Sequence, residues 1–166
     1  NKHNKIHPMI TGGSQERELR AGTENIYGIV GLAKAMEIAY RDMDKKSVHI
    51  AGLKNYMIEQ IKQRFPSIKF NGDADGRCLY TVLNLAFPPE LSNEMLLFNF
   101  DLNGIAISGG SACTSGSNTG SHVIRGIGKN LDHAPVRMSF GKMNTKEEVD
   151  LVLEYMATLF QNAPST

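Results

Sequence analysis

Apolar side chains recur along this chain at two spacings, which together predict an alternation of helices and short strands. Apolar residues three and four positions apart, the pattern of a helix with one apolar face, occupy four stretches: 24–41, 47–65, 92–102 and 145–160. The first stretch follows Thr23, the expected N-cap, and the last opens with a capping box formed by Thr145 and Glu148. Short apolar runs predict strands at 68–70, 79–87, 105–107 and 135–140, and a short helix is expected at 121–127.

The order of these elements predicts an α/β fold in which a small sheet with antiparallel pairs is covered by helices. Turn residues mark the boundaries between elements. The pair Asn103-Gly104 predicts a glycine cap after the third helix, and the cluster 71–76 predicts a turn between the first two strands. Residues 1–7 are polar and without pattern, as in a piece of chain cut from something larger.

Composition and charge exclude some classes of function. The 166 residues, 41% hydrophobic and 21% charged, suit one globular domain. With 18 basic and 17 acidic residues, the chain has no general attraction for nucleic acid or an anionic membrane. No apolar run reaches the roughly 18 residues of a transmembrane helix, and no signal-peptide pattern is present. We therefore expect a cytoplasmic protein with neither a nucleic acid nor a membrane as its partner.

The two cysteines have different settings. Cys113 lies in the segment 108–120, whose other residues are small or polar and include four glycines. Since a structural free cysteine is usually packed among apolar side chains, this setting indicates an exposed, reactive thiol on a loop; the alternative is an incidental thiol in a flexible connection. Cys78, at a predicted strand start, is interpreted as structural and inert. Two cysteines and five dispersed histidines predict no metal site.

Two further segments carry side chains suited to anions. The stretch 12–25 combines two arginines, a glycine and a threonine at a predicted helix start, where backbone amides favour negative charge. Arg137 interrupts the predicted strand 135–140, and a guanidinium binds a carboxylate through two parallel hydrogen bonds. Taken singly, each segment has an ordinary alternative: a capped helix after a polar loop, or an arginine on an exposed strand face.

Taken together, the three segments resemble the C-terminal part of the cysteine desulfurases, pyridoxal-phosphate enzymes of the class V aminotransferase group. The resemblance rests on Gly-Gly-x-Gln-Glu-x-x-x-Arg-x-Gly-Thr-x-Asn, then Gly-Ser-Ala-Cys-Thr-Ser-Gly-Ser, then Val-Arg-x-Ser-Phe-Gly, and extends over about residues 7–160. It implies the C-terminal small domain of a fold-type I enzyme, with a small, mostly antiparallel sheet covered by helices. Residues 1–22 would be a tail of the large cofactor-binding domain, and 23–166 the small domain with its long linking helix.

The resemblance also implies a role for each matching residue. Cys113 corresponds to the thiol that takes sulfur from L-cysteine, leaving L-alanine and an enzyme persulfide. Arg137 corresponds to the arginine that binds the substrate carboxylate, and Arg125 to a supporting arginine near the rim of the active site. Thr23 corresponds to the threonine that, in the homodimer, reaches the cofactor phosphate of the other subunit. The persulfide would then pass to an acceptor or scaffold protein for iron–sulfur cluster or thio-cofactor assembly.

The lysine that this chemistry requires has no counterpart in the sequence. In the family it follows a histidine upstream of the Gly-Gly motif, and this chain contains no His-Lys pair. We therefore expect the fragment alone neither to bind pyridoxal phosphate covalently nor to desulfurate cysteine. Three alternatives stay open: a selenocysteine or cystine lyase of the same fold, a non-catalytic sulfur-acceptor or interaction module, and a thiol hydrolase that uses Cys113 and His122.

Overall fold

The computed structural model describes residues 7–91, 95–109, 121–128 and 130–162. The chain divides into two compact units, Asn1–Met43 and Asp44–Thr166. This division differs from the domain boundary expected between residues 22 and 23, which stays a prediction. The first unit contains a short 3-10 helix, Gln15–Glu18, and the helix α1, Ile26–Arg41.

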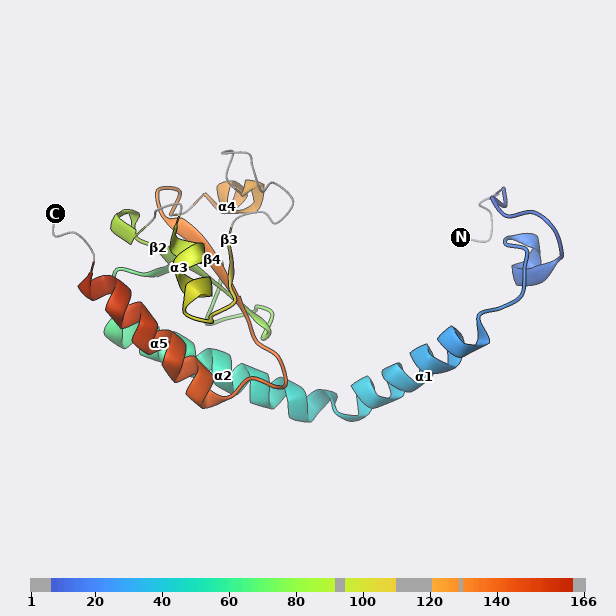
Figure 1. Ribbon diagram of the computed structural model, residues 1–166, viewed down its shortest axis with the longest axis horizontal. Helices are drawn as coiled ribbons and strands as arrows, with labels where there is room; N and C mark the ends of the chain where they lie inside the picture. The colour runs from blue at the N-terminus through green and yellow to red at the C-terminus, as the bar shows by residue number, and fades with distance from the viewer. Residues whose placement is uncertain (1–6, 92–94, 110–120, 129, 163–166) are drawn as a thin grey trace. The chain divides into compact units, whose positions relative to one another are not determined.

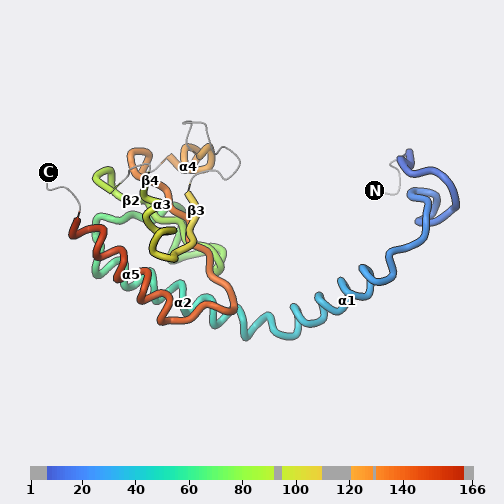
Figure 2. Tube along the Cα trace, viewed as in Figure 1, coloured from blue at the N-terminus to red at the C-terminus, as the bar shows by residue number. Residues whose placement is uncertain are grey.

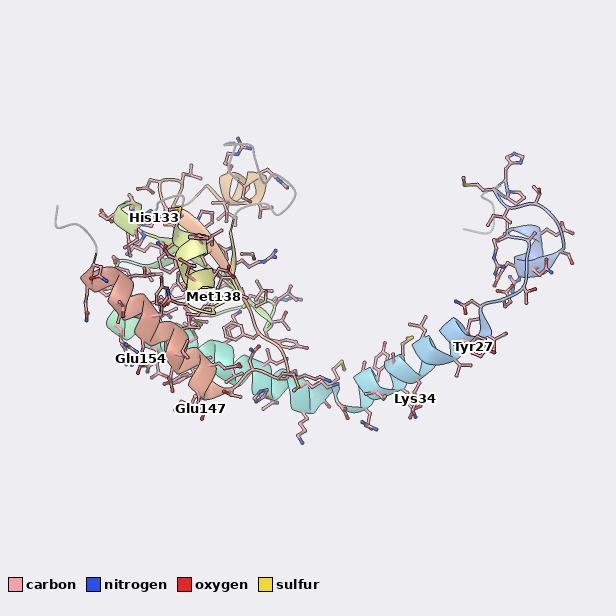
Figure 3. The ribbon with its side chains drawn as sticks, in the orientation of Figure 1. Tyr27, Lys34, His133, Met138, Glu147 and Glu154 are labelled. Carbon is pink, nitrogen blue, oxygen red and sulfur yellow. The ribbon has the colours of Figure 1, made fainter. Side chains whose placement is uncertain are left out.

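Asn25 is the N-cap of α1, and its side-chain Oδ1 accepts a hydrogen bond from the Gly28 amide at 3.0 Å. The expected N-cap at Thr23 is therefore wrong, because the asparagine two residues later closes onto the first turn and satisfies a free amide there. None of the helix's residues is buried. Tyr27, 92% exposed, and Lys34 both project from the helix, as Figure 3 shows.

The second unit contains the rest of the regular structure that the chain's described residues form. Its helices are α2 (Met43–Arg64), α3 (Leu96–Leu102), α4 (His122–Ile127) and α5 (Lys146–Gln161), with a 3-10 turn at Pro89–Leu91. Its strands are β1 (Lys69–Phe70), β2 (Val82–Phe87), β3 (Ser108–Gly109) and β4 (Ala134–Ser139). The expected elements are therefore present, with shifts at their ends; β3 pairs at 108–109 rather than at the expected 105–107.

The four strands form one sheet in the order β1-β2-β4-β3, with every neighbouring pair antiparallel (Figure 1). The central strand β4 pairs Arg137 with Asn84 of β2 on one side and with Ser108 of β3 on the other. This arrangement confirms the expected small antiparallel sheet. It also makes β3 an edge strand, at the point where the chain enters the segment that contains Cys113.

Helices α2 and α5 lie side by side and pack with the sheet around one apolar core (Figures 1 and 2). Alternate residues of β2 point into this core because side chains alternate across a strand. The Tyr56 hydroxyl of α2 also donates a hydrogen bond to Asp150 Oδ1 of α5 at 2.6 Å. The core residues of α2, α5, β2 and β4 include Ile50, Met57, Ile61, Leu83, Leu85, Phe87, Val136, Met138, Val149, Leu153 and Met156.

The N-terminus of α5 has the expected capping box. Thr145 Oγ1 accepts a hydrogen bond from the Glu148 amide at 3.3 Å, and the Thr145 amide donates to Glu148 Oε2 at 3.1 Å. Asn144 Nδ2 donates to the same carboxylate oxygen at 2.9 Å. These bonds satisfy amides that the first turn of a helix otherwise leaves free, so α5 begins at a fixed residue.

Candidate functional site

Arg137 occupies the centre of the sheet face that points away from the core. Along β4, Val136 and Met138 are buried, whereas Arg137 and Ser139 are exposed. The neighbouring positions on either side are Asn84 and Ser108. Directly opposed residues of antiparallel strands have Cβ atoms about 5 Å apart and share a face. The sheet therefore presents an arginine flanked by an amide and a hydroxyl side chain.

The guanidinium of Arg137 is available to a ligand. Within the described part of the chain it forms no ion pair and no hydrogen bond, while its carbonyl accepts a hydrogen bond from Ser108 Oγ at 3.4 Å. Guanidinium groups present several N–H donors in a planar fork, and two of these match the oxygens of a carboxylate. The role of Arg137 in binding a carboxylate is compatible with these surroundings and stays a prediction.

A row of three asparagine amides supports the strand beside Arg137. Asn130 Nδ2 donates to Asn71 Oδ1 at 3.1 Å, and Asn71 Nδ2 donates to Asn84 Oδ1 at 2.8 Å. Asn71 is 9% exposed, and Asn130 has a positive φ of 52°, which asparagine tolerates better than most residues. The row ties the connection after α4 to β2. The sequence did not reveal it, since Asn71-Gly72 indicated only a turn.

Cys113, the expected persulfide carrier, lies outside the described residues; in the sequence it falls between β3 and α4. On the preceding side the chain is fixed at Gly109, which pairs with Val136. A Cβ at this glycine would approach Leu97 Cδ1 of α3 to 2.7 Å, so a larger residue here would require the Leu97 side chain to move.

On the following side, α4 carries both Arg125 and His122, and both are exposed. Ser121 caps this helix by accepting a hydrogen bond from the Ile124 amide at 3.5 Å, and Gly128 ends it with a φ of 71°. The supporting role expected for Arg125 stays a prediction. No described carboxylate pairs with His122, so nothing in this part of the chain orients it as a base for a thiol hydrolase.

Thr23 lies in the first unit, in an exposed turn before α1. The turn is held by Arg20, which pairs with the Glu24 carboxylate and donates to the Gly22 carbonyl at 2.7 Å. Gly22 has a φ of 98°, which favours glycine there. The Arg20 guanidinium already binds Glu24 and the Gly22 carbonyl. The anion site expected at residues 12–25 therefore has fewer available hydrogen-bond donors than the sequence suggested. The cofactor contact of Thr23 stays a prediction.

The residues of this chain do not fit pyridoxal phosphate as a complete site. The sequence lacks the His-Lys pair of the family. Lys54, a buried lysine of α2, already donates to the Leu79 carbonyl at 2.8 Å and to Cys78 Sγ at 3.0 Å. Thr23 and Arg137 belong to different units. The chain by itself therefore supplies fewer groups than the cofactor needs.

A cavity of about 450 Å³ in the second unit offers no separate catalytic group. Its lining is mostly apolar and includes Met57, Ile107 and Met138. Glu148 is its one titratable lining residue, and the pKa of that carboxyl is lowered by the hydrogen bond from Asn144 and then by the Thr145 amide. Both of these donors hold the carboxylate in the capping box, where it serves the helix.

Metal and membrane sites are also absent from what the structure describes. The described residues contain no group of three or more histidine, cysteine, aspartate or glutamate side chains placed to hold a metal ion. Within those same ranges, every helix is too short or too polar to span a bilayer.

Sequence similarity to known proteins extends over nearly the whole chain. Residues 4–152 match the family model for aminotransferase class-V. The cysteine desulfurase IscS of Dictyoglomus turgidum is 37% identical over 162 residues, which cover 96% of this chain and 41% of that protein. The cysteine desulfurase IscS of Clostridium botulinum, strain Hall, is 41% identical over 160 residues, covering 95% of this chain and 40% of that protein.

Solved structures confirm the predicted fold. A NifS-like protein superposes with a TM-score of 0.73 and 29% identity over 96% of this chain and 40% of its own. A NifS-like protein from Rickettsia africae has a TM-score of 0.71 at 23% identity, which shows a shared fold. The chain thus spans about two fifths of the length of the relatives it matches. From its motifs, fold and relatives together, the chain belongs to the aminotransferase class-V family and is related to its cysteine desulfurases.

Proposed function

We propose that this chain is the C-terminal part of a cysteine desulfurase that converts L-cysteine to L-alanine and leaves a persulfide on Cys113. The observation that carries the proposal is the guanidinium of Arg137, which has no partner among the described residues and lies in the sheet beside the strand that leads to Cys113. The similarity to desulfurases at 37% and 41% identity supports the same chemistry. Arg137 would bind the carboxylate of the substrate, with Arg125 in a supporting role.

The covalent chain keeps the two proposed groups near each other. Ser108 pairs directly with Arg137, and Cys113 follows Ser108 by five residues. Five residues of fully extended chain span at most about 18 Å. An amino acid held through its carboxylate by Arg137 is therefore within reach of a thiol on this segment.

The proposed reaction transfers one sulfur atom. The Cys113 sulfur bonds to the sulfur of L-cysteine, and the carbon–sulfur bond of the substrate breaks. Its Cβ gains a proton, which gives L-alanine and the persulfide Cys113–S–SH. Pyridoxal phosphate, implied by the family for the full-length enzymes, supplies the electron sink for this bond cleavage when it is bound. The outer sulfur then passes to a thiol of an acceptor or scaffold protein.

The exposed face of α1 supports the proposal that a larger domain belongs to the same protein. Its apolar side chains are solvent-exposed, which is costly for a surface of this kind unless another structure covers it. They include Ile26, Ile29, Val30, Leu32 and Met36. We assign residues 1–22 to the tail of that domain and 23–166 to the small domain. In the homodimer, Thr23 would contact the cofactor phosphate of the other subunit.

Alanine formation from L-cysteine by the longer protein tests this function. Cys113→Ser should abolish it. Arg137→Ala should raise KM by about 10-fold to 150-fold with a smaller change in kcat, because a charge-assisted contact to the carboxylate is worth about 1.5–3 kcal/mol. Arg77→Ala, which removes an exposed arginine outside the proposed site, is the matched control and should leave both constants unchanged.

Three results would contradict the proposal. An unchanged KM in Arg137→Ala removes this residue from the substrate site. Full alanine production by Cys113→Ser removes the thiol from the reaction. Turnover of selenocysteine with none of cysteine by the unmodified protein selects the lyase of the same fold instead.

A further inference from the structure

Lys54 is a buried lysine with no acidic partner among the described residues. Its side chain is 3% exposed and lies on the apolar stripe of α2, between Ile50 and Met57. Its Nζ donates to the Leu79 carbonyl at 2.8 Å and to Cys78 Sγ at 3.0 Å. It forms no salt bridge with any carboxylate in the described ranges. Buried lysines are usually paired with an acid, so a sulfur atom in that place is unusual.

The residue that carries this sulfur atom, Cys78, is exposed. The sequence suggested a structural cysteine at a strand start, but β2 begins later, at Val82, and Cys78 is an exposed free thiol in the connection from β1. Its Sγ also donates a hydrogen bond to the Ala74 carbonyl at 3.5 Å. A small oxidant can therefore approach the sulfur from outside while Nζ of Lys54 contacts it from within.

We propose that Lys54 and Cys78 form a peroxide-dependent modification site, in which a covalent sulfur–nitrogen bond joins the two side chains. The thiol sulfur first attacks hydrogen peroxide; a sulfur–oxygen bond forms, the oxygen–oxygen bond breaks and water leaves, which gives the sulfenic acid. Nζ, after giving a proton to solvent, then attacks the sulfur. The sulfur–oxygen bond breaks, a second water leaves, and the pair has lost two hydrogen atoms in total.

Burial of Lys54 is what directs the sulfenic acid to this product. The lysine stem is packed in the core, so Nζ stays beside the sulfur instead of exploring solvent. A reacting group held in contact acts at an effective concentration far above that of a reagent in solution. The bond joins residues 24 positions apart, linking α2 to the connection between β1 and β2, and it protects Cys78 from irreversible oxidation to the sulfinic acid.

Peroxide treatment of the 166-residue chain carrying Cys113→Ser tests the proposal, since this background removes the other thiol. Mass spectrometry of the digest should show the Lys54 and Cys78 peptides joined, at their summed mass less two hydrogen atoms, and separated again by dithiothreitol. Dimedone, which labels sulfenic acids, should label Cys78 about tenfold less than in Lys54→Met. The joined peptide is measured without any change at Lys54, so that result does not depend on the folding of a variant.

Lys62→Met is the matched control. Lys62 lies on the same helix and its Nζ pairs with Asp75 of the same connection at 2.6 Å, but it does not contact the thiol. Its removal should leave the joined peptide in full yield. Equal dimedone labelling of Cys78 with and without Lys54, or sulfinic acid at Cys78 with no joined peptide, would overturn the proposal. This test requires no desulfurase activity, so its outcome is independent of the proposed function.

Discussion

Helices α1 and α5 have 16 residues each, but the apolar face of α5 is buried whereas that of α1 is exposed. Helix α5 buries Val149, Leu153 and Met156 in the core of the second unit. Helix α1 has no buried residue, and Leu32 at its middle is 63% exposed. An amphipathic pattern alone therefore does not distinguish a helix that completes a local core from one whose apolar face lacks a partner in its own unit.

The difference indicates which part of the chain can hold its structure independently. The second unit combines a sheet, two long helices and a capped helix start around one core. Beside a short 3-10 helix, the described residues of the first unit form one α-helix, α1. Isolated helices of this length are marginal in water because nucleation is costly and tertiary packing supplies most of their stability. The proposed function accounts for this difference, since the rest of a longer protein would cover α1.

Matched leucine truncations test the comparison with the largest expected effect. Leu153→Ala in α5 should lower the free energy of unfolding by about 2–5 kcal/mol, because it leaves a cavity around a fully buried position. Leu32→Ala in α1 should change it by about 0.5 kcal/mol or less in this chain. Urea unfolding measures both, and in the longer protein the cost of Leu32→Ala should rise above about 1 kcal/mol. Equal costs in the 166-residue chain would contradict the comparison.

Replacing the N-cap residues of α5 and α1 should change the free energy of unfolding less than Leu153→Ala does. Thr145→Ala should lower the free energy of unfolding of the second unit by about 1 kcal/mol, since it removes the acceptor for the Glu148 amide. Asn25→Ala removes the corresponding cap of α1 and should leave that transition within about 0.5 kcal/mol. Thermal or urea unfolding followed by circular dichroism distinguishes the two. A larger loss in Asn25→Ala would mean that α1 belongs to the same cooperative unit.

The smallest expected effect is on how the free energy of unfolding depends on pH. The pKa of Glu148 is lowered below its usual 4.5 by the hydrogen bond from Asn144 and then by the Thr145 amide. A carboxyl whose folded pKa is lowered stabilises the fold above its unfolded pKa, and this contribution disappears as pH falls through the folded pKa. The free energy of unfolding should therefore decrease as pH falls below about 4.5, and less steeply in Glu148→Gln.

Glu37→Gln in α1 is the control for this pH effect. It removes an exposed ion pair with Lys34, and such pairs contribute little to stability. Its unfolding curve against pH should match that of the unchanged chain. If Glu37→Gln reduces the loss of unfolding free energy at acid pH as much as Glu148→Gln does, the capping box is not the source of that loss.

Local sequence signals predicted those features that depend on a few neighbouring residues. The capping box at Thr145 and Glu148 was predictable because both partners lie within one turn. The end of α3 at Asn103 was predictable from Gly104, whose φ of 72° suits a glycine. Thr23 was wrong as a cap because two capping residues, Thr23 and Asn25, compete at this helix start, and spacing does not choose between them.

Features that depend on contacts between distant segments were not predictable from local sequence. Strand β3 pairs at Ser108 and Gly109, and the register of a two-residue edge strand is set by its neighbour β4. The contact of Lys54 with Cys78 joins α2 to a connection 24 residues later. One signal for it was present: Lys54 is a charged residue within the apolar stripe of its helix, which indicates a buried polar partner.

The location of the transferred sulfur after one turnover shows whether Cys113 is the persulfide carrier. The longer protein is incubated with L-cysteine, trapped with an alkylating reagent and analysed by mass spectrometry of its cysteine peptides. We expect the Cys113 peptide to gain one sulfur atom, with alanine formed in equal amount, and the Cys78 peptide to gain none. Sulfur on Cys78 instead of Cys113, or alanine without a persulfide on Cys113, would contradict it.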